Sequence, residues 1–157
     1  MISCTFEDGK IGYLRHVAVD NVVFKNNQVL LVKRSPQLST EPGKWALPAG
    51  FMERDEYLQQ AVEREIREET GYAVKNITLL TINHHPNQPH NDRQNICFVF
   101  FCEATEKIGE KDWESSDVKW FDLDNLLDPA EVGFDHYDDI QLYKKYMKEK
   151  FPLPLFK

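Results

Sequence analysis

The chemically most informative residues of this chain are the acidic side chains of one predicted helix, residues 55–70. This segment contains six acidic and two basic residues. At about 100° per residue its apolar side chains form one stripe, made up of Leu58, Ala61, Val62 and Ile66. Glu65 and Glu69 fall within the same arc, and Glu68 lies at its edge. We therefore expect carboxylates that point toward the protein, which costs free energy unless they are paired or bound to a cation.

These three glutamates are spaced so that their side chains share one surface. Glu65 is three residues from Glu68 and four from Glu69, so the three carboxylates are neighbours that repel one another. Arg64 is available to compensate this repulsion, whereas Arg67 is predicted to project outward. Two interpretations remain open: a carboxylate network linked by arginine, or a divalent-cation site whose hard oxygen ligands suit Mg²⁺ or Mn²⁺.

The elements that must position this helix predict an α/β layered domain. Strands are expected over residues 16–24, 29–33, 74–82, 96–102 and 118–121. The turn at residues 25–28 makes the first two strands a hairpin. The apolar 96–102 segment is typical of a central strand that is covered on both faces, where Cys97 and Cys102 act as small hydrophobes.

The expected helix boundaries follow from capping residues. Asp55 is the expected N-cap of the acidic helix and Gly71 is its expected terminating residue. A second helix is expected over residues 135–150, with a packed side made up of Ile140, Tyr143 and Met147. Loops are expected at residues 35–44 and 84–95, and the C-terminal FPLPLF segment is expected to pack on the surface or at an interface.

Composition excludes several classes of protein. The chain has 157 residues, 19 Lys and Arg against 26 Asp and Glu, and a formal net charge of −7. This length favours one domain spanning residues 1–157. The acidic balance disfavours nucleic acid as a partner, and the longest apolar run, residues 96–102, is far too short for a membrane helix. Three cysteines and no secretory signal favour a reducing cytoplasm.

The acidic helix and the residues before it resemble the Nudix box. The family pattern is G-x5-E-x7-R-E-U-x-E-E-x-G-U, where U is aliphatic, and its fixed residues all match within residues 50–72. The sequence departs from the usual family sequence twice, with Tyr72 at the last aliphatic position and Ala49 in place of the usual glycine. Neither residue is at a metal-ligand position. The resemblance extends over residues 17–150 and implies the Nudix fold, an α/β/α sandwich around a mixed sheet.

The resemblance also implies roles for individual residues. It implies that Glu65, Glu68 and Glu69 ligate Mg²⁺ or Mn²⁺, with the carbonyl of Gly50 as a further ligand. Glu56, Arg64 and Gly71 would mainly have structural roles in the box, Arg64 with direct chemistry as the alternative. A further glutamate, six residues before a strand tryptophan, would be a ligand or general base. Glu114 fits that position before Trp120, and Asp112 and Asp117 are near enough to compete.

The implied reaction is hydrolysis of the pyrophosphate bond in a nucleoside diphosphate linked to another moiety, X. Water attacks phosphorus, activated by the metal and by Glu68, Glu69 or Glu114. Arg34 and Arg93 are candidates for binding a substrate phosphate. A base could stack on the aromatic residues of the central strand, which are Phe98, Phe100 and Phe101.

The prolines beyond the box bear on the choice of substrate. Proline lies 14 and 17 residues beyond the box, at Pro86 and Pro89, near the spacing that marks ADP-ribose-cleaving members. We favour ADP-ribose or another nucleoside diphosphate sugar, with a (d)NTP pyrophosphatase as the alternative. A non-catalytic nucleotide sensor is the alternative of another class. The N-terminal hairpin and the FPLPLF tail could support a homodimer.

Overall fold

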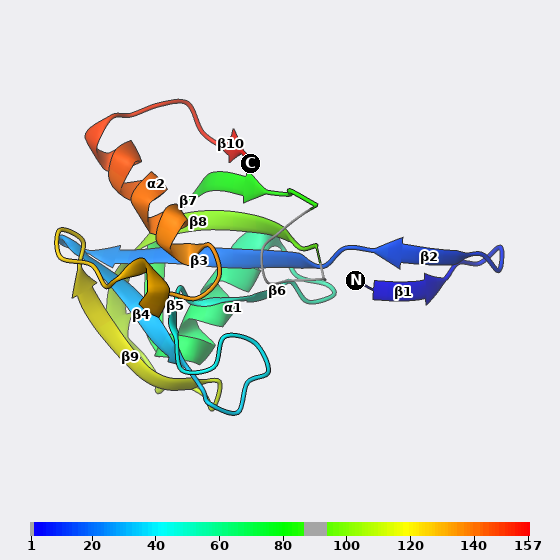
Figure 1. Ribbon diagram of the computed structural model, residues 1–157, viewed down its shortest axis with the longest axis horizontal. Helices are drawn as coiled ribbons and strands as arrows, with labels where there is room; N and C mark the ends of the chain where they lie inside the picture. The colour runs from blue at the N-terminus through cyan, green and yellow to red at the C-terminus, as the bar shows by residue number, and fades with distance from the viewer. Residues whose placement is uncertain (1, 87–93) are drawn as a thin grey trace.

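The computed structural model of this chain describes residues 2–86 and 94–157. Predictions that fall on Pro89 and Arg93 therefore lie outside the described residues. Two helices and a 3-10 turn accompany two sheets in this part of the chain (Figure 1): α1 (Leu58–Thr70), α2 (His136–Lys148) and η1 (Pro129–Glu131). The strands are β1 (Ile2–Thr5), β2 (Ile11–Leu14), β3 (Val17–Lys25), β4 (Gln28–Arg34), β5 (Trp45–Ala46), β6 (Ala49–Phe51), β7 (Tyr72–Asn83), β8 (Ile96–Lys107), β9 (Ser115–Asp122) and β10 (Leu155–Phe156).

The larger sheet is mixed, as predicted. Its strands run in the order β10-β7-β8-β3-β4-β5, while β6 pairs with β3 and β9 pairs with β4. Strand β8 is parallel to β3 and antiparallel to β7. The prediction of a central strand at residues 96–102 is therefore confirmed, although β8 continues to Lys107.

Helices α1 and α2 cover opposite faces of this sheet, so two cores are formed (Figure 1). The side chains of β3 alternate between them: Val19 and Val23 pack with α1, whereas Val22 packs with α2. The same alternation sends Phe98 and Phe100 to the α1 side and Phe101 to the α2 side. All three phenylalanines thus pack against the cores, and none lines the cleft of about 500 Å³ beside β3 and α1.

The boundaries of the helices correct two predictions. Helix α1 begins at Leu58, not after Asp55, and Asp55 has a left-handed φ of 70°. The N–H of Tyr57 donates to the side-chain oxygen of Gln60 at 2.7 Å, which caps the helix two residues later than predicted. On α2, Ile140 and Tyr143 are buried as predicted, but Met147 is 49% exposed, and the residue of that last turn that packs against the core is Tyr146.

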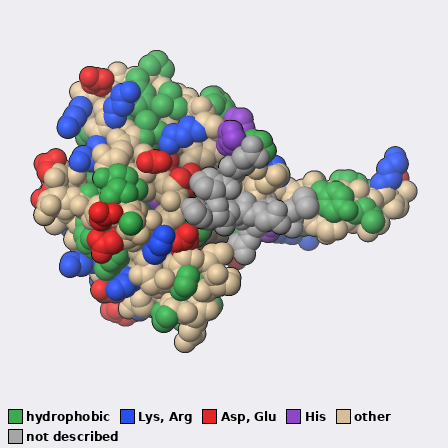
Figure 2. Space-filling model, in the orientation of Figure 1, with side chains coloured by type: hydrophobic (Ala, Val, Ile, Leu, Met, Phe, Trp, Pro, Cys, Tyr) green, Lys and Arg blue, Asp and Glu red, His purple; other side chains and the backbone are tan. Residues whose placement is uncertain are grey.

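The two ends of the chain lie at different parts of the molecule. Strand β10, within the FPLPLF tail, pairs in parallel with β7 and so extends the large sheet. Strands β1 and β2 pair only with each other and project from the body as a narrow hairpin (Figure 1). Figure 2 shows hydrophobic side chains along this hairpin, where Ile11 and Tyr13 are about two-thirds exposed, at 65% and 66%. No helix among the described residues is long and apolar enough to cross a membrane.

Candidate active site

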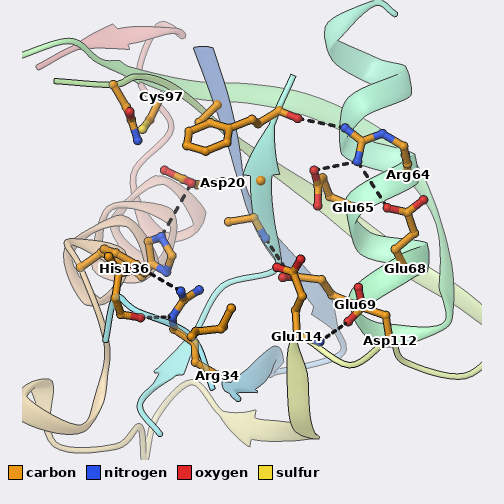
Figure 3. A pocket seen from close by; sticks show the side chains of 18 of the residues that line it. Asp20, Arg34, Arg64, Glu65, Glu68, Glu69, Cys97, Asp112, Glu114 and His136 are labelled. Carbon is orange, nitrogen blue, oxygen red and sulfur yellow. Dashed lines mark hydrogen bonds and ion pairs between the residues drawn. The ribbon is translucent and has the colours of Figure 1, made fainter. Parts of the chain in front are cut away.

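A cleft of about 500 Å³ opens between the second half of α1, the start of α2 and the first residues of β3. Figure 3 shows a group of five acidic side chains at one end of it, and Asp20 with Cys97 and His136 at the other. We call one end the box end, defined by Glu65, Glu68, Glu69, Asp112 and Glu114. We call the other the Asp20 end, defined by Asp20, Cys97, Asp135 and His136. A volume of this size is typical of small-molecule sites.

The box end is organised around the guanidinium of Arg64. Its Nε and Nη2 donate to both carboxylate oxygens of Glu56, at 3.1 and 2.8 Å, and Nη2 also donates to the carbonyl of Phe51 at 3.0 Å. Its Nη1 lies 2.7 Å from Oε1 of Glu65 and 3.4 Å from Oε2 of Glu68. These bonds raise the pKa of Arg64 and lower that of Glu56. Arg64 therefore ties the loop before α1 to the helix, as its expected structural role requires.

Two of the helix glutamates point inward, as the helical arc predicts. Glu69 is 6% exposed, and its Oε2 accepts a hydrogen bond from the N–H of Ala49 at 3.0 Å. Burial raises the pKa of both Glu65 and Glu69, and the facing acids raise it further. Glu68 and Arg67 are exposed, so the outward direction predicted for Arg67 is confirmed.

Gly50 stands opposite Glu65 across this end of the cleft. Strand β6 pairs with β3 and sets Gly50 beside Val19, on the α1 face. A Cβ placed on Gly50 would lie 2.1 Å from Oε1 of Glu65 and 2.4 Å from Oε2. Only glycine leaves room for the carboxylate of Glu65 in this position. Glycine is therefore required here by the close approach of Glu65, and not by the conformation of a turn.

The chemistry of the box end fits a divalent metal ion. Three glutamates and a backbone carbonyl are the hard oxygen donors that Mg²⁺ binds. As the side chains lie, no three His, Cys, Asp or Glu residues of the described part converge closely enough to hold a metal ion. The reason is visible in the contacts, because Arg64 holds Glu65 and Glu68, and Ala49 holds Glu69. Burial is the main cause of the raised pKa of Glu65 and Glu69, and a cation would offset the repulsion among the acids that adds to it.

The loop between β8 and β9 brings Glu114 and Asp112 to the same end. Both carboxylates face Glu69 closely enough to raise its pKa, and Glu114 does the same to Glu65. The N–H of Asp112 donates to the carbonyl of Glu68 at 2.8 Å, which ties this loop to α1. Asp117 lines a different, smaller depression beside Trp120. Of the three acids that competed for the role of ligand or base, the fold thus brings Glu114 and Asp112 into the cleft.

Arg34 lines the cleft, but its side chain is also held by the protein. Its Nε donates to the carbonyl of Thr40 at 2.9 Å and its Nη2 to Oγ1 of Thr40 at 3.1 Å. The guanidinium also lies 5.0 Å from the ring of Phe134. These contacts fix Arg34 between the loop at residues 35–44 and the start of α2, with its charge facing the cleft.

The Asp20 end is the part of the site that the sequence did not predict. Asp20 and Cys97 belong to strands assigned to the core, and Asp135 and His136 begin a helix predicted from its apolar stripe alone. Asp20 and Ala18 alternate with Val19 and so face α2, as does Cys97, the partner of Ala18 in the parallel β3–β8 pairing. An acid within a run of valines was the one available signal.

Comparison with known proteins identifies the family. The family model described as the NUDIX domain matches residues 14–143. The chain belongs to the Nudix family. It is 36% identical over 136 residues to a protein of Methanocaldococcus jannaschii named ADP-ribose pyrophosphatase, covering 85% of this chain and 74% of that protein. It is 34% identical to a Vibrio atlanticus NAD-capped RNA hydrolase, covering 71% of this chain and 39% of that longer protein.

The fold is shared with solved Nudix structures. A NUDIX hydrolase of Nitrosomonas europaea superposes with a TM-score of 0.76 at 26% identity, covering 99% of this chain and 92% of that one. The Nudix fold implied by the box is thereby confirmed, and the protein is a Nudix pyrophosphohydrolase, a family that typically uses a divalent metal. Its box residues occupy the box end of the cleft, where they meet Glu114.

Proposed function

We propose that this Nudix protein hydrolyses the pyrophosphate bond of ADP-ribose or another nucleoside diphosphate sugar, with Mg²⁺ or Mn²⁺ as cofactor. The observation that carries this proposal is the 36% identity to an ADP-ribose pyrophosphatase over 85% of the chain. The cleft supports it, because about 500 Å³ accommodates a nucleotide and its acids suit a metal-bridged pyrophosphate. The net charge of −7 likewise favours a small nucleotide over a nucleic acid.

Each residue at the box end has a proposed role. Glu65, Glu68 and Glu69, with the carbonyl of Gly50, would hold the metal. A metal held by these residues would supply positive charge to the phosphate oxygens and would lower the pKa of the attacking water. Glu56 holds Arg64, and Arg64 in turn holds Glu65 and Glu68 in register.

The proton of the attacking water needs an acceptor. Glu114 is our candidate for this general base, because it faces Glu65 and Glu69 and comes from a loop that is tied to α1 through Asp112. Arg34 is our candidate for binding a phosphate oxygen, because its charge is held at the cleft wall by Thr40. Arg93 stays a sequence-based candidate.

The test is a hydrolysis assay with Mg²⁺ over a panel that contains ADP-ribose, ADP-glucose, NADH and ATP, with the products identified. We expect AMP and ribose 5-phosphate from ADP-ribose. The Glu68→Gln, Glu69→Gln double variant should lose at least 1,000-fold in kcat, roughly the effect of removing metal and charge stabilisation. Glu63→Gln, on the exposed side of the same helix, is the matched control and should keep wild-type activity.

The same assay separates the alternatives. Undiminished hydrolysis by the double variant would remove the metal role of these glutamates. A preference for ATP over every nucleoside diphosphate sugar would replace our proposal with the triphosphate pyrophosphatase. Tight binding of one panel member without turnover would favour the sensor.

A further inference from the structure

The Asp20 end of the cleft is a second acidic site of different construction from the box end. It is assembled from three elements: β3 supplies Asp20, β8 supplies Cys97, and the start of α2 supplies Asp135 and His136. Figure 3 shows the side chain of Asp20 across the cleft from Glu65, with His136 beneath it. A substrate whose pyrophosphate lies at the box end would therefore extend toward Asp20.

The carboxylate of Asp20 has unused capacity to accept hydrogen bonds. Asp20 is 5% exposed and lines the cleft, and Nε2 of His136 lies 3.7 Å from its Oδ1. That distance is beyond hydrogen-bond length. Nδ1 of His136 accepts from the N–H of Leu47 at 3.0 Å, so the imidazole proton is on Nε2 and faces Asp20. The other neighbour is the thiol of Cys97, a weak donor whose pKa is raised by burial and by Asp20.

A second buried carboxylate near Asp20, that of Asp139, has one oxygen without a partner. Asp139 is 0% exposed, and its Oδ1 takes contacts from Lys157 at 3.0 Å and from Asn83 at 3.4 Å. Its Oδ2 and the Oδ1 of Asn83 are buried with no hydrogen-bond partner among the described residues. The Nδ2 of Asn83 also donates to Asp135 at 3.2 Å. This part of the protein therefore presents hydrogen-bond acceptors. No arginine of the described chain forms an ion pair with Asp20, Asp135 or Asp139.

The carboxylates of the Asp20 end select a ligand by its charge and by its ability to donate hydrogen bonds. Carboxylates repel a phosphate group, and a partly buried position screens this repulsion less than water does. A carboxylate accepts two hydrogen bonds at once from neighbouring hydroxyls, as acidic residues do with ribose in dinucleotide sites. A stacked base fits less well, since the ring of Phe134 is already contacted by Arg34 and His136, at 5.0 and 5.1 Å.

We propose that the Asp20 end binds the vicinal hydroxyls of a ribose through Asp20, with Asp135 beside it, and thereby excludes a third phosphate. This inference rests on the proposed function, because it assumes that the pyrophosphate lies at the box end. It makes Asp20 a specificity residue: the enzyme accepts a nucleoside diphosphate that continues as a sugar and rejects one that continues as a phosphate.

The test is the ratio of kcat/KM for ADP-ribose to kcat/KM for ATP, in the wild type and in Asp20→Asn. Asparagine keeps the shape and removes the charge, so we expect the ratio to fall at least 10-fold, with most of the change in KM. Asp135→Asn should lower the ratio in the same direction. Asp138→Asn, an exposed aspartate on the same helix, is the matched control and should leave the ratio unchanged. Melting curves identify any variant that fails to fold, in which case Asp135→Asn carries the test.

Product inhibition distinguishes the two riboses that a dinucleotide-like substrate offers. AMP carries the nucleoside ribose and ribose 5-phosphate carries the terminal one. Asp20→Asn should weaken inhibition by the product whose diol lies at this end and leave the other unchanged.

A ratio that stays constant in both variants while wild-type ADP-ribose hydrolysis persists would overturn this inference and leave the proposed function intact. If the wild type turns over neither substrate, the proposed function fails. Competition between ADP-ribose and ATP for binding in Mg²⁺ then tests the same selectivity, and equal losses of affinity for both ligands in Asp20→Asn would overturn it.

Discussion

The two ends of the cleft carry charges of the same sign but neutralise them differently. At the box end, Arg64 contacts Glu56, Glu65 and Glu68 from one side, and the cleft side is left for a cation. At the Asp20 end, the ion pairs among the described residues contain no guanidinium: Nε2 of His136 faces Asp20, and the ammonium of Lys157 faces Asp139. The comparison teaches that net acidity does not define a binding preference, because the donors that already surround each carboxylate decide what it can still accept.

The largest effect should come from filling the space opposite Glu65. We expect Gly50→Ala to reduce kcat at least 100-fold, because its methyl group would lie 2.1 Å from a carboxylate oxygen and displace a proposed metal ligand. Gly109→Ala is the matched control, since a Cβ there meets no atom closer than 4.0 Å. Steady-state kinetics on ADP-ribose checks this, and equal activity of the two variants would show that the position of Glu65 is unimportant.

The next largest effect should come from Arg64, whose guanidinium holds the box end together. Arg64→Lys replaces a fork that bonds Glu56 through two atoms with a single ammonium. We expect a loss of about 2 kcal/mol in the free energy of unfolding, at the low end for a buried pair because its side chain is 17% exposed. Urea titration measures it, with Arg67→Lys as the exposed control. A stable Arg64→Lys protein would mean that the network does not hold the loop.

The Asp20 end predicts a pH dependence of stability through Asp139. Burial raises the pKa of this carboxyl to about 7, from an ordinary value near 3.8. The folded protein binds this proton more tightly than the unfolded chain does, so the proton contributes its full stabilisation below pH 4. This stabilisation is lost as the pH rises through 7. Between pH 5 and pH 8 the wild type should therefore lose about 3 kcal/mol relative to Asp139→Asn. Unfolding at both pH values, with Asp138→Asn as control, measures it, and parallel curves would contradict it.

The smallest effect should be that of the cation itself on stability. Mg²⁺ or Mn²⁺ at millimolar concentration should raise the melting temperature by a few degrees, about 1 kcal/mol at ten times Kd. The increase should disappear in the Glu68→Gln, Glu69→Gln double variant and persist in Asp20→Asn. An unchanged wild-type melting curve would contradict metal binding at the box end. An equal loss of the metal-induced increase in Asp20→Asn would show that the Asp20 end also binds the metal.

The two ends also differ in how far the sequence predicts them. The box end depends on one helix, and a helical repeat of about 3.6 residues is enough to turn Glu65 and Glu69 inward. The Asp20 end joins residues 20, 97 and 135–136, which only the pairing of β3 with β8 and the packing of α2 bring together. Nothing local in the sequence specifies those contacts.

Smaller errors have the same physical origin. Asp55 is an intrinsically good N-cap, but the bonds from Arg64 to Glu56 hold the preceding loop and move the start of α1 to Leu58. A tertiary ion pair thus outweighs a local preference worth about 1 kcal/mol. The strands and the order of helices were predictable because their alternating or helical apolar patterns are local properties of the chain.

The end of α1 has a consequence for transferring this motif into other proteins. Gly71 closes the helix with a φ of 75°, and its carbonyl accepts hydrogen bonds from the N–H groups of Ile108 and Gly109, at 2.7 and 3.1 Å. A side chain on Gly71 would meet the carbonyl of Gly109 at 2.1 Å. The box therefore cannot be transferred alone. A graft of residues 50–72 would leave the C-terminal turn of the helix without the backbone groups that hydrogen-bond to Gly71. Any chimaera or minimised scaffold needs residues 107–114 as an inseparable second half.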